Sequence, residues 1–156
     1  MFHIIDDEDF VCDVITEIIE DHGYEAIAFG SPTDYISFVN SADFRTPIAV
    51  LTDVNMPAMN GYEMIDAVSK IRSGLKFVIM TAEFAIRSVD TDKACMFLSK
   101  PFNPDNLLKM LDRLIQCHSL LPADDHGCIS ADHREMFPIE NWFCPHKNKD
   151  CSSDCS

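Results

Sequence analysis

The sequence predicts an α/β domain built on a doubly wound, five-stranded parallel sheet. Five short apolar runs of strand length lie between residues 2 and 98, and segments with helical spacing separate them. The runs are nearly continuous rather than alternating, which is typical of strands covered on both faces. Strands that alternate with helices in this way form parallel sheets through right-handed crossovers.

The five strands are expected where the apolar runs stand. They are residues 2–5 (FHII), 24–29 (YEAIAF), 47–52 (PIAVLT), 76–81 (KFVIMT) and 94–98 (ACMFL). Each run has the length of a strand, whereas a helix would need a longer segment.

Helices are expected between the strands. Apolar residues from Phe10 to Ile19 recur at three and four positions, and Gly23 marks the end of that helix. Ser31 is a suitable N-cap for the next helix, with Pro32 in its first turn. Further helices are expected over residues 60–71, 103–116 and, from a weaker pattern, 84–91.

The periodic pattern ends near residue 118, which divides the chain into a domain of residues 1–120 and a tail of residues 121–156. Lys and Arg number 12 against 26 Asp and Glu, a net charge of -14 that repels a phosphate backbone. The tail is also acidic, and it is too short for a DNA-reading helix-turn-helix. We therefore expect no nucleic-acid partner and no DNA-binding output.

No membrane association is expected either. The apolar runs fall short of the roughly 20 residues that span a bilayer. The N-terminal stretch MFHIIDDEDF is acidic and lacks the basic start and longer apolar segment of a signal peptide. We therefore predict a cytoplasmic protein. In a reducing cytosol its seven cysteines are more typical of free thiols or metal ligands than of a disulfide framework.

Polar residues stand at the ends of four of the five expected strands. Asp6 and Asp7 follow the first strand, Asp53 the third, Thr81 ends the fourth, and Lys100 follows the fifth. The carboxyl ends of parallel strands meet at one edge of the sheet, where open α/β sheets bind their ligands. These side chains are therefore expected to converge on one site.

The convergence of three carboxylates predicts a cation and phosphoryl chemistry. Without a cation the carboxylates would repel one another, and their oxygen atoms suit Mg2+, which is commonly completed by a phosphate oxygen. A carboxylate can serve as a covalent nucleophile, so Asp53 is the candidate acceptor of a phosphoryl group. Lys100 and Thr81 can then stabilise the phosphoryl oxygens.

These motifs resemble the receiver domain of two-component response regulators. The resemblance rests on IIDDED with Asp6 and Asp7, LTDVNMPAMNGYEM with Asp53, VIMTAE with Thr81 and FLSKPF with Lys100. It implies the flavodoxin-like receiver fold, and it implies that Asp53 accepts a phosphoryl group from the phosphohistidine of a histidine kinase.

The resemblance also implies a magnesium ligand set. Mg2+ would be bound by Asp7, Asp53 and the backbone carbonyl of Asn55, with Asp6 reaching it through water. The peptide bond between Lys100 and Pro101 would be cis, as only proline readily allows.

A switch is implied as well. Phosphorylation would draw Thr81 inward and let Phe97 rotate, which changes the face formed by the fourth helix, the fifth strand and the fifth helix. Asn55 and Glu83 stand two residues after Asp53 and Thr81 respectively, beside the expected water path to the acyl phosphate. We expect this pair to set the lifetime of the phosphorylated state.

The tail carries residues that suit a metal ion. We therefore expect a small, irregular module that a bound metal ion holds together. The simplest closed set of zinc ligands is Cys128, Cys144, Cys151 and Cys155, with His146 or His133 as alternates. Such a zinc would be structural and could order a segment that lacks a core. The alternatives are a disordered acidic tail and a thiol redox sensor.

The expected helix over residues 103–116 has a second apolar row beside its core stripe. Its members are Met110, Leu114, Cys117 and Leu121. Either the tail or a second copy of the chain would cover this row, and the sequence does not choose between them.

Together these features predict a phosphorylation-activated signalling switch that acts through protein contacts or oligomerisation. Its partners would be a sensor histidine kinase or phosphotransfer protein and an unknown downstream protein. The alternatives are a phosphate relay or sink, and a Mg-dependent phosphatase that forms an aspartyl-phosphate. Such a phosphatase needs an acid two residues after its nucleophile, where Asn55 stands. Beyond autocatalytic transfer to Asp53 and hydrolysis from it, no enzyme activity is expected.

Overall fold

A computed structural model describes residues 1–82 and 94–119 of the chain. The strands are β1 (Phe2–Ile5), β2 (Ala26–Phe29), β3 (Val50–Asp53), β4 (Phe77–Thr81) and β5 (Met96–Ser99). The helices in the described part are α1 (Asp9–Asp21), α2 (Pro32–Val39), α3 (Gly61–Ile71) and α4 (Pro104–Ser119). The expected helix over residues 84–91, Glu83 and the whole tail from residue 121 lie outside the described residues.

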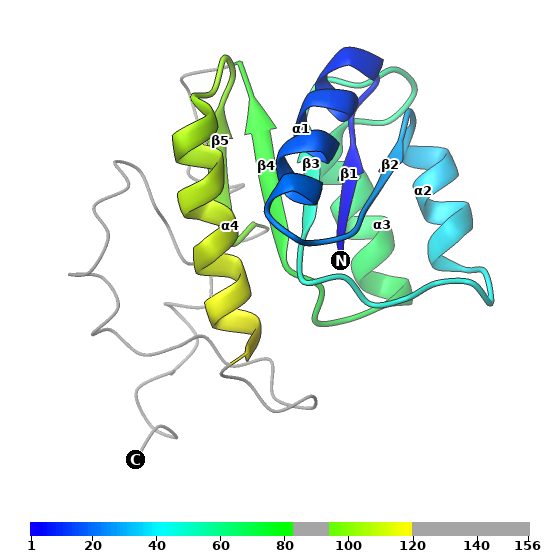
Figure 1. Ribbon diagram of the computed structural model, residues 1–156. Helices are drawn as coiled ribbons and strands as arrows, with labels where there is room; N and C mark the ends of the chain where they lie inside the picture. Colours follow the sequence, from blue (N-terminus) through cyan, green and yellow to red (C-terminus); the bar gives the residue numbers. More distant parts are fainter. Residues whose placement is uncertain (83–93, 120–156) are drawn as a thin grey trace, which may run out of the picture.

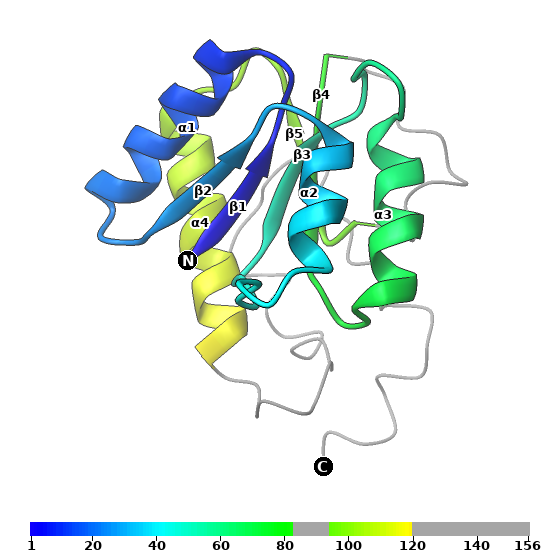
Figure 2. The same cartoon turned by 90° about the vertical axis from the view of Figure 1, so that its right-hand side faces the viewer.

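All five strands join one parallel sheet, in the order β2-β1-β3-β4-β5. Helices α1 and α4 cover one face of this sheet, and α2 and α3 cover the other (Figures 1 and 2). The predicted α/β class, with a parallel sheet covered on both faces, is therefore confirmed. The helix expected over residues 103–116 is α4, which extends to Ser119.

Local signals explain where two of the helices begin. The Ser31 hydroxyl accepts a hydrogen bond from the Asp34 backbone N–H at 3.1 Å, as its predicted N-cap role requires. Asn60 and Glu63 form a capping box at the start of α3, in which each side chain accepts from the other's backbone N–H. These caps fix the first turns of α2 and α3.

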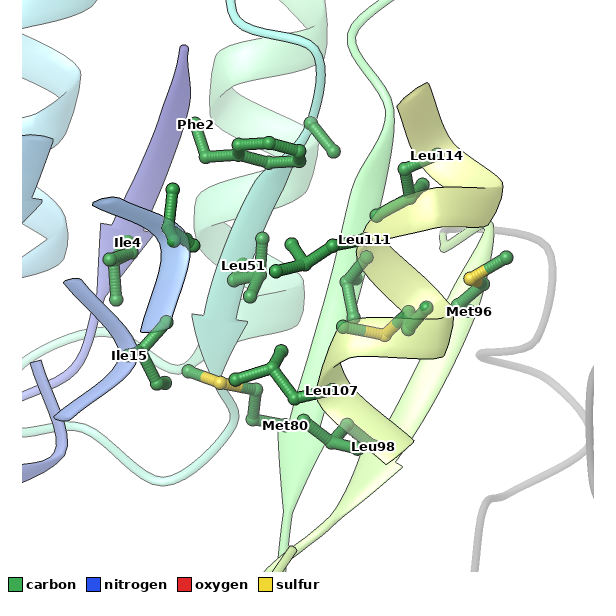
Figure 3. Close-up of a cluster of buried hydrophobic side chains, with 14 of the residues drawn as sticks. Phe2, Ile4, Ile15, Leu51, Met80, Met96, Leu98, Leu107, Leu111 and Leu114 are labelled. Carbon is green, nitrogen blue, oxygen red and sulfur yellow. The ribbon is translucent and has the colours of Figure 1, made fainter. Parts of the chain in front are cut away.

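Two apolar clusters stabilise the two faces of the sheet. One lies between the sheet and helices α1 and α4, with Ile15, Leu51, Met80, Leu107 and Leu111 packed together (Figure 3). The other lies under α2 and α3. Strands covered in this way are apolar on both faces, which accounts for their nearly continuous apolar sequence.

The expected second apolar row on the last helix needs a correction. Met110 is 3 % exposed and Leu114 is 2 % exposed, and both belong to the core cluster with Leu107 and Leu111. The helix therefore buries a wider row of apolar residues than its sequence predicted. Met110 and Leu114 are covered by the core and need no other partner. Cys117 is half-buried, and Leu121 lies outside the described residues.

In the described part of the chain, no helix is both long enough and apolar enough to cross a membrane.

Candidate functional site at the carboxyl edge of the sheet

The sheet topology brings the ends of β1, β3, β4 and β5 to one edge. Strands β1 and β3 are neighbours, yet the chain leaves β1 toward β2 and leaves β3 toward β4. This is the point at which the strand order reverses, and doubly wound sheets bind ligands beside it. Asp6 and Asp7 directly follow β1, and Asp53 is the last residue of β3.

Lys100 links the carboxylates at this edge. Its Nζ lies 2.7 Å from Oδ2 of Asp6 and 2.7 Å from Oδ1 of Asp53. A third carboxylate oxygen, Oε1 of Glu8, lies 3.7 Å from the same Nζ. One ammonium group therefore joins residues that are far apart in the sequence, since Asp6 and Lys100 are separated by 94 positions.

Asp53 is held in a fixed orientation and is almost inaccessible. It is 6 % exposed, and while Oδ1 faces Lys100, Oδ2 accepts a hydrogen bond of 2.6 Å from the Asn55 backbone N–H. Asn55 is exposed just beyond the strand. The backbone of Gly61 packs directly against the carbonyl of Asp53, and Gly61 donates its N–H to Val54 at 3.0 Å.

Burial and ion pairing act in opposite directions on the pKa values of Asp6 and Lys100. Burial raises the pKa of Asp6, and the nearby charge of Asp53 adds to this rise, although Lys100 and the Glu8 backbone N–H oppose it. Burial alone would lower the pKa of Lys100, but hydrogen bonds from its ammonium to Asp53 and Asp6 raise it. Lys100 is therefore charged at neutral pH.

The other residues predicted for the site occupy different positions. Thr81 ends β4 and is 6 % exposed, and its backbone carbonyl accepts the Lys100 N–H at 2.8 Å. Asp7 is exposed directly after the buried Asp6. Phe97 is half-buried on β5 and packs against the cluster under α2 and α3. The peptide bond between Lys100 and Pro101 is cis, as the resemblance implied.

The remaining predicted residues cannot be placed. Glu83 lies outside the described residues, as do the expected zinc ligands Cys128, His133, Cys144, His146, Cys151 and Cys155.

The residues at the edge suit a magnesium ion in their chemistry. Asp6, Asp7 and Asp53 offer hard oxygen ligands, and two carboxylates share one ammonium, so negative charge is left for a cation to balance. Within residues 1–82 and 94–119, no three His, Cys, Asp or Glu side chains are grouped so that they could hold a metal by themselves. Backbone oxygen and water would therefore have to complete the ligand set.

Sequence reasoning missed two residues of the site. Glu8 reaches Lys100, and the only sequence signal was its place directly after the acidic pair. Gly61 lets the start of α3 approach the end of β3, because a Cβ at this position would collide with the Asp53 carbonyl. Its signal was a glycine immediately after the N-cap Asn60.

Comparison with known proteins agrees with this arrangement. Residues 2–112 match the family described as the response regulator receiver domain. The chemotaxis protein CheY of Thermotoga maritima is 29 % identical over 115 residues, covering 71 % of this chain and 93 % of that protein. The chemotaxis response regulator CheY4 of Vibrio cholerae superposes with a TM-score of 0.64 at 26 % identity, covering 72 % of this chain and 96 % of that one.

Other relatives are much longer than the matched region. The DNA-binding transcriptional regulator NtrC of Azospirillum brasilense is 28 % identical over 128 residues, which cover 78 % of this chain but 26 % of that protein. Two further transcriptional regulators are covered over 59 % and 40 % of their lengths. The family match spans most of the described residues and includes Asp6, Asp53 and Lys100. The chain thus belongs to the family of response regulator receiver domains, the phosphoacceptor switches of two-component systems.

Proposed function

We propose that Asp53 is the phosphoacceptor of this receiver domain and that a histidine kinase or a phosphotransfer protein supplies the phosphoryl group. Receiver domains of response regulators are phosphorylated by histidine kinases. The observation that carries the assignment is the geometry of Asp53. Its carboxylate ends the central strand β3, one oxygen faces Lys100 at 2.7 Å, and a backbone N–H orients the other oxygen.

The transfer is a simple displacement at phosphorus. A carboxylate oxygen of Asp53 forms the new bond to phosphorus while the bond from phosphorus to the donor breaks, and the donor leaves with that electron pair. Lys100 balances charge on the phosphoryl oxygens, because its ammonium already contacts the acceptor. The Thr81 hydroxyl is proposed to donate to a second phosphoryl oxygen.

Mg2+, which is typical of receiver domains, is proposed as the cofactor. Asp7, Asp53 and the backbone carbonyl of Asn55 would hold it, and Asp6 would act through water. When bound, the ion neutralises charge on the phosphoryl group. Asp6 is buried and already paired with Lys100, which fits an indirect role better than direct ligation.

Two further roles belong to the same proposal. Phe97 would be the switch residue, moving when Thr81 is drawn toward the phosphoryl group, and its half-buried position on β5 supports this proposal. Asn55 and Glu83 would set the rate of dephosphorylation. Unchanged dephosphorylation rates in variants of both residues would contradict that role.

The output is proposed to be a change in protein contacts or oligomerisation. The acidic composition of the chain supports this proposal, because a net charge of -14 repels a phosphate backbone. A phosphate relay or sink would need the same acceptor chemistry, so an output assay is required to separate these functions.

A second proposal concerns the tail. Cys128, Cys144, Cys151 and Cys155 would bind a structural Zn2+, with His146 or His133 as alternates. Metal analysis of the purified full chain should find stoichiometric zinc, and chelation should alter its circular dichroism. Absence of zinc would contradict this proposal, and loss of zinc on mild oxidation would favour the redox-sensor alternative.

Acetyl phosphate and Mg2+ test the acceptor chemistry. The wild-type chain should gain one phosphoryl group in intact mass, and Asp53→Asn should gain none. Asp13→Asn, an exposed acid on α1, is the control and should behave as wild type. Equal phosphorylation of Asp53→Asn and wild type would overturn the assignment.

A further inference from the structure

Glu8 places a third carboxylate beside the ammonium of Lys100. Its Oε1 lies 3.7 Å from Nζ, compared with 2.7 Å for the oxygens of Asp6 and Asp53. The Glu8 side chain is 67 % exposed, whereas Asp6 is fully buried. Glu8 therefore approaches Lys100 from the solvent side, from which a phosphodonor must also arrive.

The Glu8 carboxylate has no evident structural task at this position. Glu8 is the N-cap residue of α1, yet its side chain makes no capping hydrogen bond. The bonds that shape this turn come from its backbone, which donates to Asp6 Oδ1 and accepts from Val11 and Cys12. Replacing the carboxylate with an amide would keep these bonds and would remove only the charge.

We propose that Glu8 is a positioning residue that competes with the incoming phosphoryl group for Lys100 and thereby slows phosphorylation of Asp53. This inference rests on the proposed function. The Asp53 oxygen bonds to phosphorus as the donor leaves with its electron pair, and the phosphoryl oxygens then need the Lys100 ammonium. The Glu8 carboxylate attracts that ammonium from 3.7 Å and repels the phosphoryl charge. The same negative charge strengthens the attraction of the edge for Mg2+.

The rate of phosphorylation tests the competition directly. We would follow the full chain by intact mass, with acetyl phosphate at saturating Mg2+, for wild type, Glu8→Gln and Glu8→Asp. Glu8→Gln should react about two- to fivefold faster, the size expected for one exposed ion pair. Glu8→Asp keeps the charge and should remain close to wild type. Glu17→Gln, the same charge change at an exposed position further along α1, should match wild type.

Two measurements separate a charge effect from a structural one. The difference between Glu8→Gln and wild type should disappear at about 1 M salt, where the screening length is roughly 3 Å. Calorimetric titration with Mg2+, in the absence of any phosphodonor, should give a dissociation constant about two- to fivefold higher for Glu8→Gln. A distorted site would not combine weaker Mg2+ binding with faster phosphorylation.

The outcomes distinguish the proposed role of Glu8 from the proposed function of Asp53. If wild type is phosphorylated on Asp53 but Glu8→Gln reacts no faster than Glu17→Gln, the role of Glu8 is overturned and the proposed function stands. A rate difference that persists unchanged at high salt also overturns it. If wild type is not phosphorylated at all, both are overturned.

Discussion

At the scale of single residues, Lys100 controls the electrostatics of the site. Its ammonium is the cation that the structure places between the fully buried Asp6 and the nearly buried Asp53. Removing one partner of a buried ion pair leaves an uncompensated charge, which costs more than the pair contributes. The fold and the chemistry of the edge therefore depend on the same side chain.

Lys100→Ala should lower the free energy of unfolding by about 3 kcal/mol, at the lower end for a broken buried pair because Lys100 retains some exposure. Urea denaturation without Mg2+ measures this value. Adding Asp6→Asn to Lys100→Ala should recover much of the loss, because one of the unpaired carboxylates is then neutral. A double variant as unstable as the sum of the two single variants would contradict this account.

His3 is a second residue whose position has a measurable consequence. It is fully buried on β1, its Nδ1 lies 3.2 Å from the Tyr35 hydroxyl, and Nε2 has no hydrogen-bond partner within the described structure. Its ring also meets those of Phe29, Phe38 and Phe44 edge-on. Burial among these apolar rings lowers the pKa of His3 to about 4.

The contribution of His3 to stability should therefore rise with pH between about 4 and 6.5. In this window the unfolded chain binds a proton on His3 and the folded chain does not, so falling pH favours unfolding. The full effect is about 3 kcal/mol, complete above pH 6.5 and lost as the pH falls toward 4. Urea denaturation across this range should give a shallower dependence for His3→Gln. An identical dependence in both proteins would contradict the lowered pKa.

At the scale of elements, the start of α3 fixes the end of β3. The capping box of Asn60 and Glu63 sets the first turn of the helix, and Gly61 then packs against the Asp53 carbonyl. The acceptor is thus held from two sides, by the backbone of α3 and by the ammonium of Lys100. A side chain at residue 61 would push these two elements apart.

Gly61→Ala should destabilise the fold by about 2 kcal/mol, because its Cβ would overlap the backbone carbonyl of Asp53, which has no flexible end that could move away. It should also slow phosphorylation by acetyl phosphate, since the acceptor would shift from Lys100. Gly30→Ala is the matched control, because nothing lies within 4 Å of its added Cβ. Equal melting temperatures for the two variants would show that the close contact is unimportant.

At the scale of the whole molecule, the order of the strands creates the site. Because β1 and β3 are neighbours, the loop after β1 and the end of β3 meet, and β4 and β5 add Thr81 and Lys100 on one side. The register agrees, since Asp53 pairs with Met80 and Thr81 with Ser99. Residues as distant in the sequence as Asp6 and Lys100 therefore meet at one edge of the sheet, although no sequence motif links them.

The sequence was sufficient to predict the sheet and the convergence of its strand ends. Apolar runs fix where strands lie, and parallel pairing then carries Asp6, Asp53 and Lys100 to one edge whatever the details of the loops. The observed strands begin within a few residues of the predicted positions, with β2 beginning at Ala26 and β5 at Met96. Hydrophobic patterning determines this level of the structure.

Side-chain contacts could not be predicted in the same way. The approach of Glu8 to Lys100 depends on the path of one turn, and the aromatic surroundings of His3 depend on α2 and the loop that holds Phe44. The burial of Met110 depends on how closely α4 packs on the sheet. Neither periodicity nor spacing determines such distances, because they follow from three-dimensional packing.

The central claim is that one aspartate at the end of β3 carries the phosphoryl group, and identifying the modified residue tests it most directly. After phosphorylation with acetyl phosphate and Mg2+, borohydride reduction converts the acyl phosphate to a stable alcohol, and peptide mass spectrometry then locates it. We expect the reduced residue at position 53, and none in the Asp53→Asn chain. Reduction at another acidic residue, with Asp53 unmodified, would contradict the account.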